Sequence, residues 1–448
     1  DATETERVSG VLKALAVDSG VAVVAETTWA AIEGRRALRV RWDEGPNAKQ
    51  SSDQIMTALA QAAAPRSVPV PGAPEGRLDA VYTLTLQAHV PMEPLNCTAD
   101  VRDGRCEVWA PTQDPQGARA AAQRASGLPT EQVVVHTTLM GGAFGRRSSG
   151  DFVEEAVRVA QAFGAPVQVV WTREDDIQHG RYQPSAHHFL SARLDAKGLP
   201  ATWRHVIASE QAAGDIASGA QLRYAVGAQN TPVRAQSAGV PVGPWRSVAF
   251  YHNIFAVESF IDELAALGNS DPLELRRRLL ARDAGMLAVL DLAAERAGWG
   301  GALPAGRGRG LAVCAYERTR AALVIEASVA PGGVVRVERA VCAIDCGVVV
   351  NPDGVEAQIE GAIAFGLTAA LKGAITVAGG RVEQSNFHDY PLLRLPEMPR
   401  VEVAIVASDR EPSGVGEPGV PLVGPALANA LFAATGQRVR SLPVRLEA

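Results

Sequence analysis

The sequence predicts an α+β fold in which mixed sheets are flanked by helices. Three observations lead to this class. Strands and helices alternate over residues 80–175, helical segments follow one another over 253–297, and strand-like runs follow one another over 309–346. The 448 residues are enough to bury a large core and to form two or three domains.

The N-terminal part predicts a small α/β unit followed by a connection. A Val-rich run over 20–25 predicts a strand, 28–36 a helix and 37–42 a second strand, so we interpret 1–45 as the remnant of a small α/β domain. Residues 46–79 predict an irregular linker because they contain Pro65, Pro69, Pro71 and Pro74.

The next segment predicts a βαβ unit built around a glycine loop. The loop over 141–145 separates a strand from a helix, and Asp151 and Glu154 have the spacing of a capping box at the start of that helix. The expected strands are 81–88, 106–110, 132–140 and 167–171, and the expected helices are 114–127 and 151–163.

The C-terminal half predicts a helical block and then a sheet. Val257, Phe260, Ile261 and Leu264 recur at helical spacing, which predicts a helix with one buried face that belongs to the core. The expected helices are 253–267, 271–281, 287–297 and 355–371, and the expected strands are 309–317, 321–330 and 334–346. We divide this part of the chain into 80–300 and 301–448.

Composition excludes several classes of protein. The net charge of −6, without a run of Lys and Arg, argues against nucleic-acid binding. The longest apolar run, 361–371, is shorter than the roughly 20 residues that a membrane helix needs. Asp1–Glu6 are acidic and contain no targeting signal. Five scattered cysteines predict neither a disulfide framework nor an iron-sulfur site on this chain, and we expect Cys342 and Cys346 in a strand that turns at Gly347.

One carboxylate stands in an unusually restrained segment, Gly414-Val415-Gly416-Glu417-Pro418-Gly419. Glycine permits close approach and proline restrains its neighbours, so Glu417 is a candidate base. The alternative is an ordinary surface turn with a solvated Glu. A helix is expected next, with Pro425 near its first turn and Gly436 as its stop.

The glycine loop, Gly141-Gly142-Ala143-Phe144-Gly145-Arg146-Arg147, is a candidate anion site. Its backbone N–H groups can face an anion, and Arg146 and Arg147 would add charge. The loop matches neither the dinucleotide fingerprint nor the phosphate-binding P-loop.

Several segments taken together resemble one family. They are His89 to Cys97, Trp109 to Gln113, the 141–147 loop with Asp151-Phe152, Val170 to Asp176, Pro241 to Ser247, Gln358 to Gly361, and Gly414 to Gly419. In this order, over about 20 to 445, they resemble the molybdopterin-binding catalytic subunit of the xanthine oxidase family, of the isoquinoline 1-oxidoreductase β-subunit type.

The resemblance implies a molybdenum hydroxylase. Such an enzyme oxidises an electron-poor carbon of an N-heteroaromatic compound or an aldehyde, with water as the oxygen source. The implied cofactor is molybdopterin, in its cytosine dinucleotide form, with molybdenum held by the pterin dithiolene, so no protein metal ligand is expected. The implied partners are a small [2Fe-2S] subunit that carries the iron-sulfur clusters and an external electron acceptor.

The resemblance also implies residue roles. Glu417 corresponds to the general base, and Gln113 to the glutamine that hydrogen-bonds an oxo ligand of the metal. The implied cofactor-binding residues are Gly142, Ala143, Phe144, Gly145, Arg146, Arg246, Gln358 and Gly416. Residues 1–45 correspond to part of a hammerhead-like domain, 80–300 to the first molybdopterin-binding part, and 301–448 to the second, which carries Glu417.

The chain departs from the family at several positions. It resembles the C-terminal major portion of a subunit, as a split, cleaved or incompletely represented subunit would, and in a split subunit the missing N-terminal part would be a separate chain. Relatives with export signals favour a periplasmic over a cytoplasmic location. Ala143 stands where a third glycine is usual, 207–239 is short, and 314–322 replaces a segment of small residues expected to face the cofactor.

Alternatives remain for the whole chain and for single residues. A cofactor-free scaffold or partner-binding protein would keep the same fold, and a hydrolase would pair Glu417 with a second carboxylate such as Glu93. Gln113 would instead cap the helix that begins near Asp114, and Arg246 would pair with a carboxylate. His89, His187 and His188 are interpreted as structural or surface histidines and are left out of the site.

Overall fold

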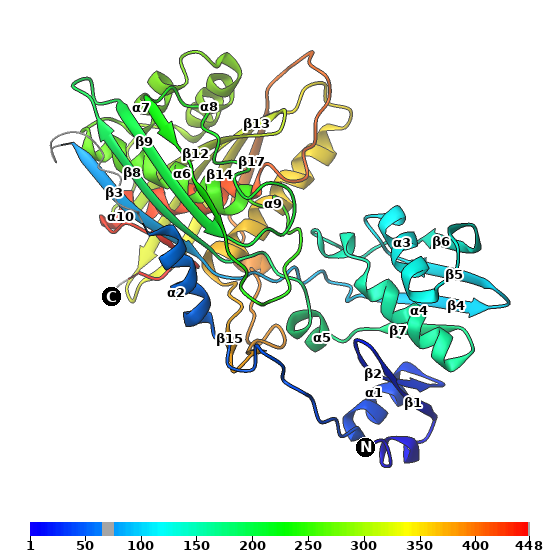
Figure 1. The fold of residues 1–448 in the computed structure, drawn as a ribbon. Helices are drawn as coiled ribbons and strands as arrows, with labels where there is room; N and C mark the ends of the chain where they lie inside the picture. Colours follow the sequence, from blue (N-terminus) through cyan, green and yellow to red (C-terminus); the bar gives the residue numbers. More distant parts are fainter. Residues whose placement is uncertain (65–75, 447–448) are drawn as a thin grey trace.

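The computed structural model describes residues 1–64 and 76–446, which form a larger and a smaller lobe (Figure 1). The smaller lobe contains the N-terminal unit and the sheet of β4 to β7. The larger lobe contains the long strands β8, β9 and β12–β14 with their helices. Both are mixed α/β structures, so the predicted fold class is confirmed.

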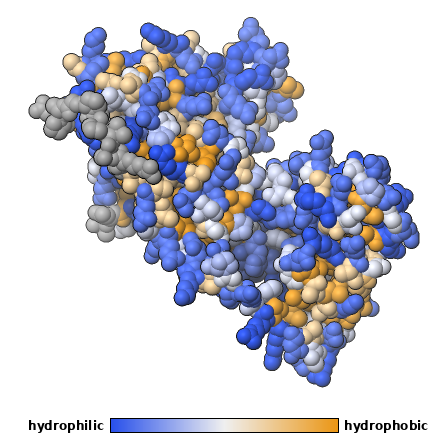
Figure 2. Space-filling view, viewed as in Figure 1, coloured by the Kyte–Doolittle hydropathy of each residue, from blue (hydrophilic) through white to orange (hydrophobic). Residues whose placement is uncertain are grey.

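The N-terminal unit is a two-stranded antiparallel hairpin covered by one helix. Its elements are β1 (Val11–Val17), β2 (Gly20–Ala25) and α1 (Thr28–Ala37), after a short 3-10 helix, Thr5–Arg7. The prediction of a strand over 37–42 was wrong, because β2 pairs with the preceding β1 and no strand lies in residues 38–42. Figure 2 shows apolar residues gathered on the smaller lobe. In the N-terminal unit and just after it, Leu12, Trp29 and Trp42 are exposed.

The linker prediction over 46–79 was wrong for its first part. Helix α2 (Ser52–Ala63) lies there, and a capping box between Ser51 and Gln54 starts it. Its Ile55 and Leu59 are buried in a cluster with residues of the neighbouring sheet. The four prolines on which the linker was predicted fall in 65–75, outside the described residues.

The sheet of the smaller lobe has the strand order β6-β5-β4-β7 and is mixed, because only β5 and β6 pair in parallel. The crossover from β6 to β7 through α4 is the predicted βαβ unit. Asp151 does not cap α4: Gly150 is the N-cap, and the Asp151 carboxylate pairs with Arg146 at 2.9 Å. The elements are β4 (Asn96–Arg102), β5 (Arg105–Ala110), α3 (Pro115–Ser126), β6 (Val133–Thr137), α4 (Asp151–Phe163) and β7 (Val167–Val170), with short 3-10 helices at Thr130–Gln132 and Arg146–Ser148.

The larger lobe contains two sheets. One has the order β10-β9-β8-β3-β18, with β11 also on β9, and the other has the order β12-β13-β14-β17. The first comprises β3 (Arg77–Leu84), β8 (Ala186–Leu194), β9 (Pro200–Ser209), β10 (Ala228–Asn230), β11 (Val233–Ala235) and β18 (Ser441–Leu442). The second comprises β12 (Arg307–Tyr316), β13 (Thr319–Ala330), β14 (Val334–Asp345) and β17 (Arg400–Ile405). Because β18 joins β3, residues near position 80 and residues near position 440 share one core.

Helices fill the space beside these sheets. They are α5 (Arg173–Gln178), α6 (Phe250–Leu267), α7 (Pro272–Leu279), α8 (Ala284–Ala297), α9 (Pro352–Leu371) and α10 (Val420–Thr435), with a 3-10 helix at Leu395–Glu397 and a small hairpin of β15 (Val377–Ala378) and β16 (Arg381–Val382). Helix α10 begins at Val420, so Pro425 lies inside it and not near its first turn. Its backbone lies against β12, where a Cβ on Gly310 would come within 2.1 Å of the Ala430 nitrogen.

Helix α6 is buried on all sides, and not on one face as predicted. Residues from Tyr251 to Ala265 are all buried, because α6 packs against α10 and both large sheets. Its acidic residues are paired: Glu258 accepts from Arg276 Nε at 3.0 Å and from the Val313 amide at 3.1 Å. A paired, hydrogen-bonded carboxylate is the form in which charge is tolerated in a core.

Three histidines whose rings contact one another form a second polar cluster in the core. His188 Nδ1 lies 2.9 Å from His205 Nε2, and the His188 ring lies 5.2 Å from that of His252. Burial lowers the pKa of His205 and His252 to about 3 and that of His188 well below its usual value. The structural interpretation of His188 agrees with this environment.

None of the helices in residues 1–64 and 76–446 combines the length and apolar character needed to cross a membrane. The five cysteines are buried free thiols, and β14 ends just before Cys346 and Gly347, whose φ is +78°, as the turn prediction requires.

Arg276→Met is expected to lower the free energy of unfolding by about 3–5 kcal/mol, because it leaves the Glu258 carboxylate buried without its partner. Arg277→Met on the same helix is the matched control. Arg277 pairs at the surface with Glu274 and Asp291, and its loss should cost less than about 1 kcal/mol. Chemical unfolding followed by circular dichroism measures both, and equal losses would contradict the assigned role of the buried pair.

Stability should fall as pH decreases from about 6.5 towards 3, since the unfolded chain binds protons at its histidines while the buried ones stay neutral. Each such histidine contributes about 1.4 kcal/mol per pH unit within that window. His252→Phe should reduce this slope, whereas His388→Gln at an exposed position should not. Urea titrations from pH 7 to pH 4 test the difference, and identical slopes would refute it.

Candidate active site

Four residues that precede α6, Pro244-Trp245-Arg246-Ser247, connect the predicted loops; we call them the 244–247 segment. The Ser247 amide donates to Glu417 Oε1 at 3.0 Å, and Ser247 Oγ donates to the Glu417 carbonyl oxygen at 2.7 Å. Ser247 is fully buried and has φ of +81°, a conformation that a non-glycine residue adopts only when its surroundings impose it. Glu417 is therefore half-buried and held in place, and is not a solvated turn residue.

Arg246 joins Gly416 to Gln358. Its Nε donates to the Gly416 carbonyl oxygen at 2.5 Å, and its Nη2 donates to the backbone and side-chain oxygens of Gln358 at 3.1 and 3.0 Å. The alternative in which Arg246 pairs with a carboxylate is not observed. Burial lowers the pKa of Arg246, and the nearby charge of Glu417 opposes that effect.

The glycine loop packs directly on the 244–247 segment. A Cβ on Gly145 would lie 1.8 Å from the Pro244 carbonyl oxygen, and φ at Gly145 is +106°, so only glycine fits. The Gly145 amide donates to Gln113 Oε1 at 3.1 Å. Gln113 does not cap α3, because Asp114 does so by accepting from Gly117.

The loop presents free hydrogen-bond donors. Among the described residues, nothing accepts a hydrogen bond from the amides of Gly142, Ala143 or Phe144, or from the amide nitrogen of the Gln113 side chain. Ala143 is buried, and Phe144 has φ of +55°. Backbone donors without partners in a restrained loop fit a ligand that carries oxygen acceptors.

Arg146 and Arg147, which were expected to add charge to an anion site, are both buried. Arg146 is 1% exposed, pairs with Asp151 and lies over the ring of Trp171. Arg147 is fully buried and donates to the carbonyl oxygens of Gly142 and Glu93 and to the Glu93 carboxylate. Both guanidinium groups brace the loop, and a cofactor-binding role of Arg146 stays a prediction.

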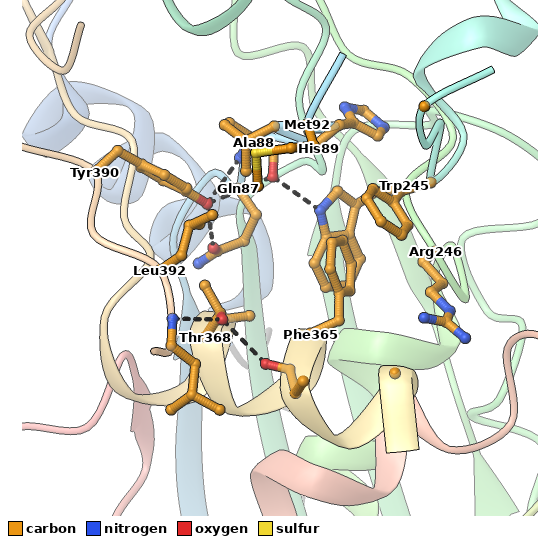
Figure 3. A pocket seen from close by; sticks show the side chains of 17 residues that line it. Gln87, Ala88, His89, Met92, Trp245, Arg246, Phe365, Thr368, Tyr390 and Leu392 are labelled. Carbon is orange, nitrogen blue, oxygen red and sulfur yellow. Dashed lines mark hydrogen bonds between the residues drawn. The ribbon is translucent and has the colours of Figure 1, made fainter. Parts of the chain in front are cut away.

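Three aromatic rings form a wall beside the loop. The Phe144 ring lies 4.7 Å from Phe365 on α9, and the Trp245 ring lies 4.6 Å from the same Phe365. Figure 3 shows Trp245 and Phe365 side by side at the edge of a pocket of about 290 Å³. The sequence did not single out Phe365, although it lies two turns after Gln358 on the same helix.

The pocket is mainly apolar, and its Gln87, Thr368 and Tyr390 side chains form hydrogen bonds, whereas His89 Nδ1 is buried without a partner among the described residues. The Tyr390 hydroxyl donates to Gln87 Oε1 at 3.0 Å, and Thr368 Oγ1 donates to the Ala364 carbonyl oxygen, as the dashed lines in Figure 3 mark. Arg246 and Phe144 line this pocket, but Glu417 and Gln113 do not. His89 lies at its edge with Nε2 against the Pro244 carbonyl oxygen, and burial lowers its pKa to about 4, in line with a structural role.

The sequence analysis did not predict two residues that contact Glu417. Ser247 was part of the Pro241–Ser247 motif but was given no role, and its amide donates to Glu417 Oε1. Tyr316 donates its hydroxyl to Glu417 Oε2 at 2.7 Å. Among residues 1–64 and 76–446 there is no cluster of three or more His, Cys, Asp or Glu able to hold a metal ion.

Family models described as molybdopterin cofactor-binding domains match residues 73–280 and 295–399, which together are most of the chain. The chain belongs to the molybdopterin-binding xanthine oxidase family. It is 31% identical to isoquinoline 1-oxidoreductase subunit beta of Brevundimonas diminuta, over 98% of this chain and 61% of that protein. It is 28% identical to the membrane-bound aldehyde dehydrogenase [pyrroloquinoline-quinone] of Gluconacetobacter polyoxogenes, over 99% of this chain and 65% of that protein.

Solved structures share the fold of this family member. Quinoline 2-oxidoreductase from Pseudomonas putida 86 superposes with a TM-score of 0.83 at 13% identity, covering 99% of this chain and 91% of that one. The aldehyde oxidoreductase from Desulfovibrio gigas superposes with a TM-score of 0.79 at 15% identity, covering 99% of this chain and 74% of that one. The chain spans less than two thirds of the length of the two curated relatives named above.

Gly145→Ala is expected to destabilise the protein more than Gly164→Ala. Both glycines have positive φ, but a Cβ at Gly164 meets nothing within 4 Å, so only backbone strain of about 1–2 kcal/mol applies there. At Gly145 the loop must also move away from Pro244 and release Gln113. Chemical unfolding of the two variants measures the difference, and equal destabilisation would show that the close contact is not required.

Proposed function

We propose that this chain forms the cofactor-binding catalytic part of a molybdenum-dependent hydroxylase. The observation that carries the proposal is a fixed carboxylate, Glu417, held by the same 244–247 segment that braces the glycine loop and Gln358. Family membership supports molybdopterin as the cofactor. The two relatives named above, an isoquinoline oxidoreductase and an aldehyde dehydrogenase, support an N-heteroaromatic compound or an aldehyde as substrate.

The chain's own groups fit a molybdopterin. The free amides of Gly142, Ala143 and Phe144 would donate to its oxygen acceptors, and Arg246 and Gln358 would supply polar contacts on the opposite wall. When bound, the cofactor supplies the two-electron redox chemistry of the hydroxylation. We assign it to the cytosine dinucleotide form, with a [2Fe-2S] partner subunit that receives the electrons.

Glu417 is suited to take a proton. Each of its carboxylate oxygens already accepts one hydrogen bond, from Ser247 or Tyr316, and each keeps a second acceptor site for the proton of the attacking water-derived hydroxyl. Gln113 would donate from its free amide nitrogen without a change of charge, since its Oε1 is engaged by Gly145.

The hydrolase alternative has less support. Glu93 is the second carboxylate that it needs, yet Glu93 accepts from the Gly141 amide at 2.7 Å and from Asn96 and Arg147. Because Glu93 makes these hydrogen bonds to the glycine loop, we assign it a structural role and not that of a second catalytic carboxylate.

Glu417→Gln keeps the shape of the side chain and removes its basicity. Turnover of the purified protein with its partner subunit should fall by about 10²- to 10⁴-fold at unchanged molybdenum content. Glu411→Gln, an exposed position in the same loop, is the matched control and should keep normal turnover.

Metal analysis distinguishes a molybdenum-dependent enzyme from a cofactor-free scaffold. Near-normal turnover of Glu417→Gln with cofactor present would reject the base. Absence of molybdenum and pterin from the wild-type protein after native purification would instead support the cofactor-free scaffold.

A further inference from the structure

The segment 314–322, which departs from the small residues expected there, forms the turn between β12 and β13 and contacts the Glu417 loop. Thr319 Oγ1 donates to the Gly414 carbonyl oxygen at 2.8 Å, and Arg318 Nη2 donates to the Pro412 carbonyl oxygen at 3.3 Å. The Tyr316 hydroxyl donates to Glu417 Oε2 at 2.7 Å. The turn therefore anchors both the backbone of the loop and the carboxylate at its end.

Tyr316 is itself restrained and stays protonated. Its ring packs on Phe250 at the start of α6, with centroids 4.5 Å apart. Burial, and next the hydrogen bond to Glu417, raise the pKa of Tyr316 well above its usual value. The hydroxyl is therefore a neutral, permanent donor over the whole range in which a carboxylate titrates.

The two donors to Glu417 come from different elements and meet different oxygens. The Ser247 amide binds Oε1 and the Tyr316 hydroxyl binds Oε2, so the plane of the carboxylate is fixed. The titratable groups around them are Arg246 on the 244–247 segment, and Glu317 and Cys314 on the β12–β13 side. Arg246 is turned to Gly416 and Gln358, which leaves Tyr316 as the titratable side chain that hydrogen-bonds the carboxylate.

We propose that Tyr316 is a positioning residue for Glu417: its hydroxyl fixes the orientation of the carboxylate by binding Oε2. This rests on the proposed function, in which Glu417 is the base. A base must lie within hydrogen-bond reach of the proton that it takes, so a carboxylate held by a donor on each oxygen keeps its free acceptor sites directed at one place.

Tyr316→Phe tests this, because it removes the hydroxyl and keeps the ring on Phe250. Infrared spectra of the purified full chain, with the Glu417→Gln variant as the subtraction reference, report the carboxylate stretching bands of Glu417. These bands should shift because Oε2 loses its donor, and kcat of the enzyme assembled with its partner should fall about tenfold at unchanged molybdenum content. KM should change little, since the hydroxyl is assigned to the carboxylate and not to the substrate.

Tyr82→Phe is the matched control. It also removes a buried tyrosine-to-glutamate hydrogen bond, of 2.6 Å to Glu263, but at a structural carboxylate that Arg440 pairs. This variant should leave the infrared bands of Glu417 and kcat unchanged. A change of the same size in both variants would overturn the proposal, because it would reflect general loosening of the core.

A second measurement covers the case in which Tyr316→Phe folds poorly. Removal of the carboxylate in Glu417→Gln should change the hydrogen bond of the Tyr316 hydroxyl, which ultraviolet difference spectra at neutral pH detect. No change in either the infrared or the ultraviolet spectrum overturns the proposal. If Glu417→Gln abolishes turnover while both spectra stay unchanged, the positioning role is wrong and the proposed function stands. If the spectra change but Glu417→Gln keeps turnover, the proposed function is wrong and the hydrogen bond is real.

Discussion

The candidate site depends on the 244–247 segment, which holds three distant parts of the chain in one arrangement. Gly145 packs on the Pro244 carbonyl, Arg246 bridges Gly416 and Gln358, and the Ser247 amide fixes Glu417. Most of these contacts are made to backbone groups, so side-chain rotation cannot relax them. Displacement of any one of the three loops therefore breaks contacts of the others.

The segment is rigid because the fold beneath it is. It runs directly into α6, which is buried on every side, and α6 is tied to α7 by Glu258 and Arg276 and to β12 by the Val313 amide. The same strand β12 ends at Tyr316, and α10 begins just after Glu417. The core of the larger lobe thus fixes the donors and the acceptor of the Glu417 carboxylate through adjoining elements.

The sequence predicted the fold class, most strands and helices, and the restraint on Glu417, because each follows from local pattern. The sequence also contains the capping-box residues of α2, but the prolines that follow led to the prediction of a linker there. The inward turn of Arg146 and the burial of α6 were not predictable, since both depend on partners distant in sequence: the Trp171 ring beneath Arg146 and the two sheets around α6. Tyr316 was noticed only as a departure, because a hydrogen bond to a residue about a hundred positions away leaves no local signal.

The central claim is that Glu417 is immobilised beside a molybdenum cofactor. Anomalous diffraction at the molybdenum absorption edge, on crystals of the natively purified protein, tests it most directly. The account predicts one anomalous peak between the Glu417 carboxylate, the Gln113 amide and the backbone of Phe144. A peak elsewhere in a fully loaded protein, with the Glu417 carboxylate facing solvent, would contradict it.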